Sequence, residues 1–364
     1  MKKNQRKILF LINGLGLGNS TRCYAIIKEL CKRGHEVSLF TNGNGLWFFS
    51  KENDKEIKYI GTLNSYNYAS SKSGINIVKT LFYIPIFIFN YLSNLKKISR
   101  HLSKNKYDLI ISDSIYQFIP PLRYSTPSIA INNSKLVKEY KESHISHFPT
   151  SLLLQYYFIE ILDYYYHCIF PKYVICPSIK SNSLFPTRKS FYFSPPIVRP
   201  ITRDESLESH PEKIDILIML SGSNISAPFE IKNRKDHNIT IIGNAPTSLP
   251  RDQKIHIIEK TTDTMNYISK SKVVIINGGF SAISEALYLG IPMVVIPILK
   301  HAEQWVNAKF IEDLGLGLVG TNSNAEKKAT TILSNLQNYT DKLADYKGRN
   351  GVEVSTNMIE SFMS

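Results

Sequence analysis

The sequence predicts an α/β protein with two Rossmann-like, doubly wound domains that face a central cleft. Short apolar runs alternate with helical patterns along the chain, which is typical of βαβ units and parallel sheets. A proline-rich polar stretch breaks this alternation at 194–213. At 364 residues, the chain is also longer than one average domain needs. We therefore expect an N-terminal domain over 1–195, a linker over 196–213, a C-terminal domain over 214–345, and a last helix over 346–364 that packs back on the first domain.

The individual elements follow from local pattern. The short apolar runs predict strands at 7–12, 36–40, 57–60, 107–112 and 128–131, and, after the linker, at 214–219, 239–242, 255–258, 273–276 and 293–296. Longer segments with helical spacing predict helices near 20–32, 75–102, 150–170, 264–270, 282–289 and 303–314.

The composition indicates a folded protein that meets something anionic. Lys and Arg number 44 against 30 Asp and Glu, a formal net charge of +14. This excess favours contact with nucleic acid, an acidic membrane face or phosphorylated small molecules, although a solvated surface would explain it equally well. The motifs described below lead us to expect no nucleic acid partner.

The cysteines and the N-terminus predict a cytoplasmic protein. Cys23, Cys31, Cys168 and Cys176 are too few for a disulfide framework and form no C-x-x-C pair, which indicates a reducing compartment. The apolar core of the N-terminus, 8–12, is shorter than a signal peptide requires.

The segment 75–102 is apolar and aromatic at first and strongly basic at its end. Its most apolar run, 81–92, is too short to span a bilayer. An amphipathic helix of this kind suits docking to the inner face of an anionic membrane, but a core helix pair with a solvated basic end fits as well. The tyrosine-rich stretch 155–167 could stack on a sugar or serve only in packing.

A glycine loop follows the first expected strand, with Gly14, Gly16 and Gly18 just before Asn19. Glycines let the backbone approach a ligand, and the next helix offers free N–H groups to anions. A dinucleotide site would need G-x-G-x-x-G spacing and an acid after the second strand, and both are missing here. A purely structural tight turn remains open.

The sharpest signal is a second strand–glycine–helix motif, which starts at Asn277, Gly278 and Gly279. The helix N-terminus near Ser281 can bind a diphosphate. Glu285 comes about one turn later, where its carboxylate can accept hydrogen bonds from both ribose hydroxyls.

Further polar residues follow the next expected strand at Glu303 and Gln304. Because ligands of open parallel sheets bind beyond the carboxyl ends of the strands, we expect these groups to converge on one crevice. A solvated helix residue would explain any one of them, but not the ordered set.

The run 277–308, NGGFSAISEALYLGIPMVVIPILKHAEQWVNA, resembles the donor-binding region of GT-B-fold, nucleotide-sugar-dependent glycosyltransferases. It is most similar to MurG-like N-acetylglucosaminyltransferases, which act on the lipid-linked peptidoglycan precursor, and to UDP-glycosyltransferases. The run 14–22, GLGLGNSTR, resembles the acceptor-side loop of the same enzymes.

The resemblance implies a role for each matching position. The donor diphosphate would be held by Asn277, Gly278, Gly279 and Ser281, with Ser221, Gly222 and Ser223 facing it. The ribose would be bound by Glu285, the transferred sugar by Glu303 and Gln304, and the edge of the base by 258–262. The acceptor would be bound by the loop of Gly14, Gly16 and Gly18.

Two departures from the family pattern affect catalysis. Many relatives carry His where this chain has Asn19 and Asn277, and an amide cannot take up a proton near neutral pH. We therefore expect Asp113, after the strand 107–112, to be the general base, with Asn19 binding the acceptor. A helix cap is the alternative role for Asp113, and the segment 142–147 is then the next place to look for a base.

No metal is expected. His144 and His147 form an H-x-x-H pair with no further ligands nearby, and the sequence contains no Asp-x-Asp motif. The expected co-substrate is a nucleotide sugar, with no bound cofactor.

These features together predict a hexosyltransferase-like enzyme of class EC 2.4. It would transfer a sugar from a UDP-sugar to a hydroxyl of a lipid-linked, surface-glycan or small-molecule acceptor, with inversion and without a metal. A nucleotide-sugar hydrolase or epimerase of the same fold, or a non-catalytic sugar-nucleotide-binding protein, is the alternative.

Overall fold

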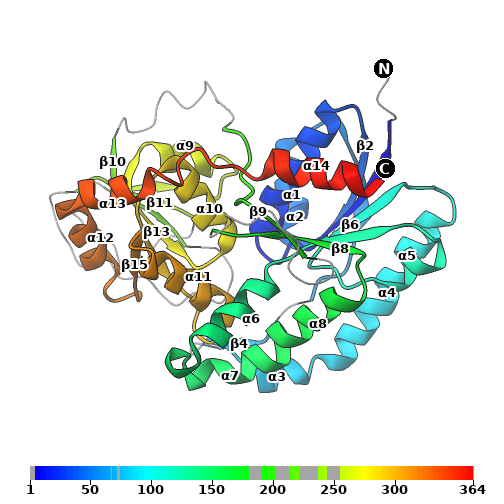
Figure 1. The fold of residues 1–364 in the computed structure, drawn as a ribbon, viewed down its shortest axis with the longest axis horizontal. Helices are drawn as coiled ribbons and strands as arrows, with labels where there is room; N and C mark the ends of the chain where they lie inside the picture. Colours follow the sequence, from blue (N-terminus) through cyan, green and yellow to red (C-terminus); the bar gives the residue numbers. More distant parts are fainter. Residues whose placement is uncertain are drawn as a thin grey trace. The chain divides into compact units, whose positions relative to one another are not determined.

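The computed structural model describes residues 5–66, 68–71, 74–179, 191–201, 213–220, 237–243 and 255–363. The chain divides into two compact units. Unit 1 comprises Met1–Ala69, Asn76–Arg199 and Asn350–Ser364, and unit 2 comprises Ser70–Ile75 and Pro200–Arg349. Each unit is built around its own parallel sheet (Figure 1).

The sheet of unit 1 has seven parallel strands in the order β3-β2-β1-β6-β7-β8-β9. Its strands are β1 (Lys7–Ile12), β2 (Glu36–Thr41), β3 (Ile57–Thr62), β6 (Leu109–Asp113), β7 (Ser128–Ile131), β8 (Tyr173–Pro177) and β9 (Phe191–Ser194). The central strands are nearly continuous apolar runs because the sheet is buried on both faces.

Helices surround this sheet. They are α1 (Gly18–Lys32), α2 (Gly43–Glu52), α3 (Ile77–Leu81), α4 (Ile84–Leu102), α5 (Ile119–Arg123), α6 (Ser134–Ser143), α7 (Leu153–Gln155), α8 (Ile161–Ile169) and α14 (Val352–Met363). The helix expected over 75–102 is two helices, with Pro85 in the first turn of α4, where its missing N–H costs nothing. The helix expected over 150–170 contains a π-helical turn, Tyr156–Glu160, between α7 and α8.

The last helix, α14, belongs to unit 1. Glu360 accepts a hydrogen bond from Arg33 Nη1 at 2.8 Å and lies 3.1 Å from His35 Nε2. Phe362 stacks on Tyr173 with ring centroids 4.1 Å apart. The chain therefore closes on the sheet from which it started.

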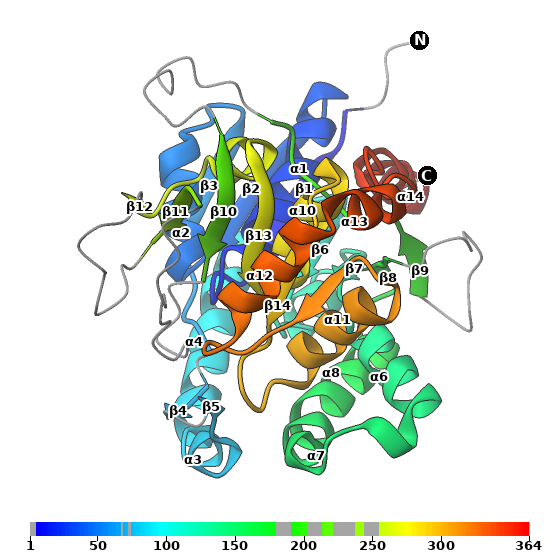
Figure 2. The same cartoon turned by 90° about the vertical axis from the view of Figure 1, so that its left-hand side faces the viewer.

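The sheet of unit 2 has six parallel strands in the order β12-β11-β10-β13-β14-β15. Its strands are β10 (Ile214–Met219), β11 (Ile239–Ile242), β12 (Ile255–Ile258), β13 (Ser271–Asn277), β14 (Met293–Ile296) and β15 (Gly317–Val319). Its helices are α9 (Thr264–Ser269), α10 (Phe280–Leu289), α11 (Ala302–Asp313), α12 (Ala325–Ser334) and α13 (Leu336–Leu343). Ala325, Ala329 and Ile332 of α12 pack on one face of the sheet (Figure 2). A small antiparallel pair, β4 (Ser70–Ser71) and β5 (Gly74–Ile75), also belongs to unit 2.

Strand order locates the functional edge of each unit. The order reverses between β1 and β6 in unit 1 and between β10 and β13 in unit 2. Ligands of doubly wound sheets bind beyond the carboxyl ends of the strands at such switch points. The loops after β1, β6 and β13 are therefore the places to look for chemistry, and the predicted α/β class with two parallel-sheet domains is confirmed.

Candidate active site

The glycine turn after β13 is clamped against helix α11. A Cβ atom on Gly278 would lie 2.5 Å from the backbone oxygen of Gln304, so no other residue fits without movement. Asn307 Nδ2 donates a hydrogen bond to the Gly278 oxygen at 3.0 Å. A Cβ atom on Gly279 would meet no atom within 4 Å. The first glycine thus fixes the turn, and the second leaves the start of α10 approachable.

The polar side chains around this turn are buried and hydrogen-bonded. Asn277 Nδ2 donates to the Ile296 oxygen at 3.0 Å, which ties the end of β13 to β14. Glu285, which is buried one turn into α10, accepts a hydrogen bond from Thr264 Oγ1 at 3.1 Å. The carboxylate therefore has a fixed orientation.

Helix α11 brings the other predicted donor residues to the same strand ends. Gln304 Oε1 accepts a hydrogen bond from the backbone N–H of Ile298 at 3.0 Å, and Glu303 lies beside it in the first turn. Just before them, burial lowers the pKa of His301 to about 4, so this imidazole is neutral at pH 7. Ser221, Gly222 and Ser223 lie outside the described residues.

In unit 1 the glycine loop after β1 makes an equally close approach, to the loop after β2. Gly14 N donates to Asn42 Oδ1 at 2.7 Å, and a Cβ atom on Gly14 would lie 1.8 Å from the Asn42 backbone oxygen. Gly16 has open space around its Cβ position, and Gly18 begins α1. Asn19 Nδ2 donates back to the Asn13 oxygen at 3.2 Å, so its amide braces the loop.

Asp113 ends β6 as expected, but its carboxylate is already engaged. The residue is fully buried, and both its oxygens bind the Arg22 guanidinium, at 2.6 Å from Nε and 2.6 Å from Nη2. Cys23 Sγ lies 3.2 Å from Oδ2 as a further donor. This geometry does not favour the general-base role predicted for Asp113, because both carboxylate oxygens are buried in a bidentate ion pair with Arg22. Asp113 instead positions α1 on the sheet.

The sequence profile of glycosyl transferase family 1 matches residues 6–338. The chain belongs to this family and is a glycosyltransferase. Two similar proteins are both described as uncharacterized glycosyltransferases. One, from Methanosarcina acetivorans, is 27% identical over 333 residues, covering 85% of this chain and 84% of the relative. The other, from Methanosarcina mazei, is 27% identical over 334 residues with the same coverage.

Solved glycosyltransferases share the fold over the whole chain. A UDP-glucosyltransferase from Polygonum tinctorium has a TM-score of 0.72 at 10% identity, covering 100% of this chain and 99% of its own. The calicheamicin glycosyltransferase CalG4 has 0.62 at 17%, with 99% of both chains covered. MurG from Acinetobacter baumannii has 0.58 at 14%, with 98% and 99% covered. The predicted GT-B-type relationship is confirmed.

The glycosyltransferase contains a second buried charge pair that the sequence analysis missed. Asp163 Oδ1 lies 3.2 Å from His167 Nδ1, and Asn132 Nδ2 donates to Asp163 Oδ2 at 2.8 Å. Burial would lower the pKa of His167, but the Asp163 carboxylate raises it overall. Burial likewise opposes ionisation of Asp163, but the His167 charge lowers its pKa overall. The i, i+4 spacing of the two residues was the available sequence signal.

Arg22 was also missed, although it stands in the glycine-loop motif three residues after Asn19. Its guanidinium points to Asp113 and lies 3.5 Å from Asn133 Oδ1. In unit 2 the missed residues are Thr264 and Asn307, which hold Glu285 and Gly278. None of these three residues follows the end of a strand directly, which is the position that the sequence analysis searched.

The segment 142–147, the alternative source of a base, follows the far end of α6. Glu142 pairs with Lys138 at 2.5 Å, His144 stacks on Tyr140 with centroids 4.2 Å apart, and His147 contacts Ser146. Ten helical residues place this segment about 15 Å along the axis from the sheet edge where α6 begins. In the described ranges, no three His, Cys, Asp or Glu side chains gather as a metal site.

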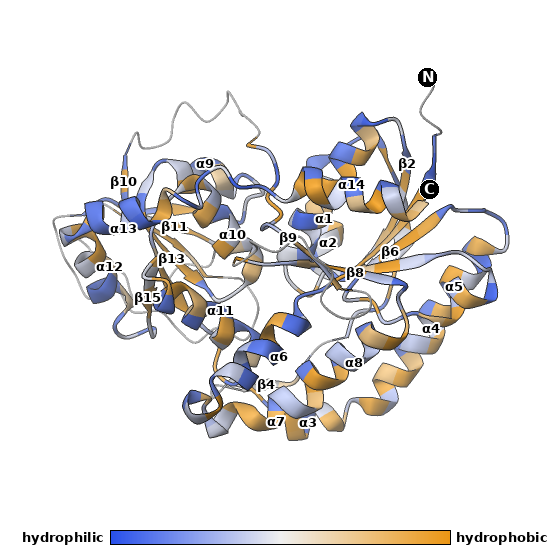
Figure 3. Ribbon diagram, in the orientation of Figure 1, coloured by the Kyte–Doolittle hydropathy of each residue, from blue (hydrophilic) through white to orange (hydrophobic). Residues whose placement is uncertain are grey.

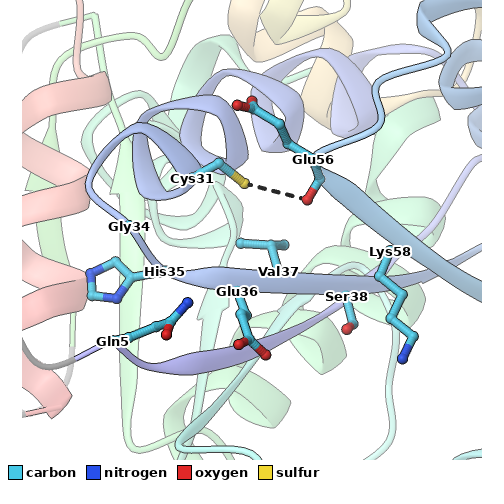
Figure 4. A pocket seen from close by; sticks show the side chains of 9 residues that line it. All are labelled: Gln5, Cys31, Gly34, His35, Glu36, Val37, Ser38, Glu56 and Lys58. Carbon is cyan, nitrogen blue, oxygen red and sulfur yellow. Dashed lines mark hydrogen bonds between the residues drawn. The ribbon is translucent and has the colours of Figure 1, made fainter.

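A cavity of about 310 Å³ lies at the opposite edge of the unit 1 sheet (Figure 4). Its lining comes from the amino ends of β1, β2 and β3 and the end of α1: Gln5, Cys31, Gly34, His35, Glu36, Val37, Ser38, Glu56 and Lys58. Burial raises the pKa of the Cys31 thiol to about 11, so this cysteine is protonated at neutral pH. Its place at the amino ends of the strands separates this cavity from the glycine loop.

The helices are too short or too polar to be membrane spans: none in the described part of the chain is long and apolar enough to cross a bilayer.

Proposed function

We propose that this glycosyltransferase transfers a sugar from a UDP-sugar donor to a hydroxyl acceptor, with inversion at the anomeric carbon and without a metal ion. The observation that carries the proposal is the turn after β13. There a clamped glycine, an open glycine and a buried, oriented carboxylate follow one another into α10.

Each donor group has a counterpart in unit 2. The N–H groups at the start of α10, near Gly279 and Ser281, would bind the diphosphate. Glu285 would accept hydrogen bonds from the ribose hydroxyls, and Glu303 and Gln304 from the sugar hydroxyls. Asn277 would hold the turn in place, and the loop of Ser221, Gly222 and Ser223 would face the phosphates. The choice of UDP follows from the resemblance of 277–308 to UDP-dependent enzymes.

Transfer would be a single displacement. The acceptor oxygen attacks the anomeric carbon, the bond from that carbon to the diphosphate oxygen breaks, and UDP leaves with the electron pair. Helix-terminal N–H groups stabilise the charge that develops on the leaving diphosphate. Asn19 would bind the acceptor oxygen. Since Asn19 cannot take the proton and both oxygens of the buried Asp113 are engaged by Arg22, we propose that it passes to water as the new bond forms.

The acceptor would carry its hydroxyl on a lipid-linked or surface glycan and be reached from the cytoplasmic face of the membrane. The excess of positive charge supports this choice. MurG, one of the structural relatives, shares only the fold with this chain at 14% identity.

Isothermal titration with UDP tests the donor site. Glu285→Ala removes a charged hydrogen-bond acceptor, an effect of about 1.5–3 kcal/mol, so we expect UDP to bind roughly tenfold to a hundredfold more weakly. Asp341→Ala, an exposed acid of unit 2, is the matched control and should bind UDP like the wild type. Equal affinity in the folded Glu285→Ala variant would refute the ribose assignment.

Chelation tests the metal-free step. Turnover of UDP-sugar with a glycan or lipid-linked acceptor should be unchanged in EDTA, because the proposed diphosphate ligands are N–H groups rather than carboxylates. Loss of turnover that Mg²⁺ or Mn²⁺ restores would contradict this. Sugar release at the same rate without acceptor would indicate hydrolysis instead of transfer.

A further inference from the structure

We propose that unit 1 carries a docking platform for an anionic lipid bilayer, formed by the outer faces of α3–α4 and α7–α8. The proposal extends the lipid-linked acceptor named above to a defined surface. It does not depend on the chemistry of the donor site, so the two can fail separately.

The first face lies along α3 and the first half of α4. Phe82 and Phe89 are 77% and 68% exposed. They are joined by other exposed apolar side chains, namely Val78, Leu81, Tyr83, Ile84, Ile86, Ile88 and Leu92. Only the second half of α4 is anchored in the core, through Ile98 and Leu102. Figure 3 shows hydrophobic colouring along much of α3 and α4.

The second face is a stripe along α7 and α8. Leu154, Phe158, Leu162, Tyr165 and Ile169 recur at intervals of three or four residues, and all are exposed. Residues between them, such as Tyr156, Glu160 and His167, are buried. One face of this helical segment packs within unit 1. The apolar stripe on its other face stays exposed in the described part of the chain.

The two faces are parts of one platform. Phe118 of the segment before α5 stacks on Phe170 after α8, with centroids 4.0 Å apart. The same ring lies 6.4 Å from Tyr91 of α4 and 6.4 Å from Tyr166 of α8. Figures 1 and 2 both show α3 and α7 at the same end of unit 1. This aromatic contact joins α4 to α8, and the two helical segments bring their apolar faces to the same end of unit 1.

Charge favours an anionic bilayer as the occupant. The sequence from 57 to 107, which includes α3 and α4, contains eight Lys and Arg and no Asp or Glu. Lys96 and Arg100 are exposed where the apolar half of α4 ends. Beside the second stripe, Lys141 lies 5.6 Å from the Tyr156 ring centre, whereas Lys138 is paired with Glu142.

A second copy of the chain fits this surface less well than a membrane does. Pairing the platform with itself would bring positive charges of the same helices together, which is unfavourable. Aromatic and aliphatic side chains flanked by Lys and Arg are instead the features of helices that lie in the interface of an anionic membrane.

Vesicle co-sedimentation of the full chain tests the platform. We expect binding to vesicles of equal parts phosphatidylcholine and phosphatidylglycerol, little binding to phosphatidylcholine alone, and weaker binding at high salt. Phe82→Ser/Phe89→Ser should weaken binding at least about a hundredfold, because two large apolar side chains no longer insert. Lys96→Gln/Arg100→Gln should weaken it about thirtyfold.

Matched controls make the same changes elsewhere. Lys51→Gln/Lys55→Gln removes two exposed charges outside the platform, and Tyr59→Ser/Ile257→Ser removes two exposed apolar side chains outside it. Both should bind vesicles like the wild type. Phe89→Trp supplies a direct probe, whose fluorescence should shift to shorter wavelength only with the anionic vesicles.

The outcomes separate the alternatives. Failure of the wild type to bind anionic vesicles would overturn the proposal, as would equal losses in the platform and control variants. Self-association that Phe82→Ser/Phe89→Ser abolishes, without vesicle binding, would assign the surface to a second copy. Unchanged vesicle binding by Glu285→Ala, together with its weaker UDP binding, would support both proposals independently.

Discussion

The switch points of the two units contain similar glycine loops, but the ionisable side chains near them have different partners. In unit 1, Arg22 of α1 pairs with Asp113 at the end of β6, and within α8 His167 pairs with Asp163, which Asn132 after β7 contacts. In unit 2, a neutral His301 follows β14, and Glu285 of α10 receives a hydroxyl hydrogen bond. Asp113 thus meets a charged side chain of the neighbouring helix, whereas Glu285, for which a ribose-binding role is proposed above, meets a hydroxyl.

In both units, one glycine of the loop is closely packed and another is open. Gly14 and Gly278 have backbone atoms pressed against them, whereas Gly16 and Gly279 face open space. In each loop one glycine is required by packing, and the other leaves room at the start of a helix.

Separating the Arg22–Asp113 pair should have the largest effect. Asp113→Asn leaves the Arg22 guanidinium buried without its charge partner, which typically costs about 3–5 kcal/mol of folding free energy. We expect a correspondingly lower unfolding free energy by urea titration. Turnover should fall only in proportion to the folded fraction, because Asp113 positions α1 and does not meet the acceptor.

Two further variants sharpen this result. Glu36→Gln breaks an ion pair with Lys7 whose side chains are 54% and 60% exposed, so it should change stability by less than about 1 kcal/mol. Arg22→Met/Asp113→Leu removes both buried charges and should recover much of the loss. A stable Asp113→Asn protein with strongly reduced kcat would instead restore the general-base assignment.

The glycine pairs give the next largest effect. Gly278→Ala places a methyl group against the Gln304 backbone and should destabilise unit 2 by about 1–3 kcal/mol, with weaker UDP binding. Gly14→Ala should do the same to unit 1 without affecting UDP. Gly279→Ala and Gly16→Ala are the controls for stability alone, since their methyl groups meet no protein atom within 4 Å. Equal melting temperatures for Gly278→Ala and Gly279→Ala would contradict the close contact with α11.

The sequence was sufficient for the fold, the family and the position of both glycine loops. Strands such as Lys7–Ile12 and Met293–Ile296 are apolar runs between clear turn signals, so local pattern specifies them. The Asp113 partner could not be predicted in the same way. Whether a strand-end carboxylate is free depends on the direction of Arg22 on α1, which tertiary packing determines. Short elements such as α5 and β9 were missed because they carry too little periodic pattern.

His301 and His167 should give opposite pH dependences, with a smaller effect. The folded-state pKa of His301 is lowered to about 4, so the stability it contributes is lost as pH falls below about 6.5, by roughly 2 kcal/mol at pH 5. The pKa of His167 is raised, so the stability from its pairing with Asp163 is present below about pH 6.5 and is lost as pH rises through the folded-state value.

Urea unfolding across this pH range, for the wild type and for His301→Gln and His167→Gln, measures how the free energy of unfolding depends on pH at each site. Relative to its variant, the wild type should lose stability toward acid for His301 and toward base for His167. Slopes of the same sign would show that one of the two imidazoles has the opposite charge state to the one expected, and that the surroundings of His301 and His167 do not differ in their effect on charge.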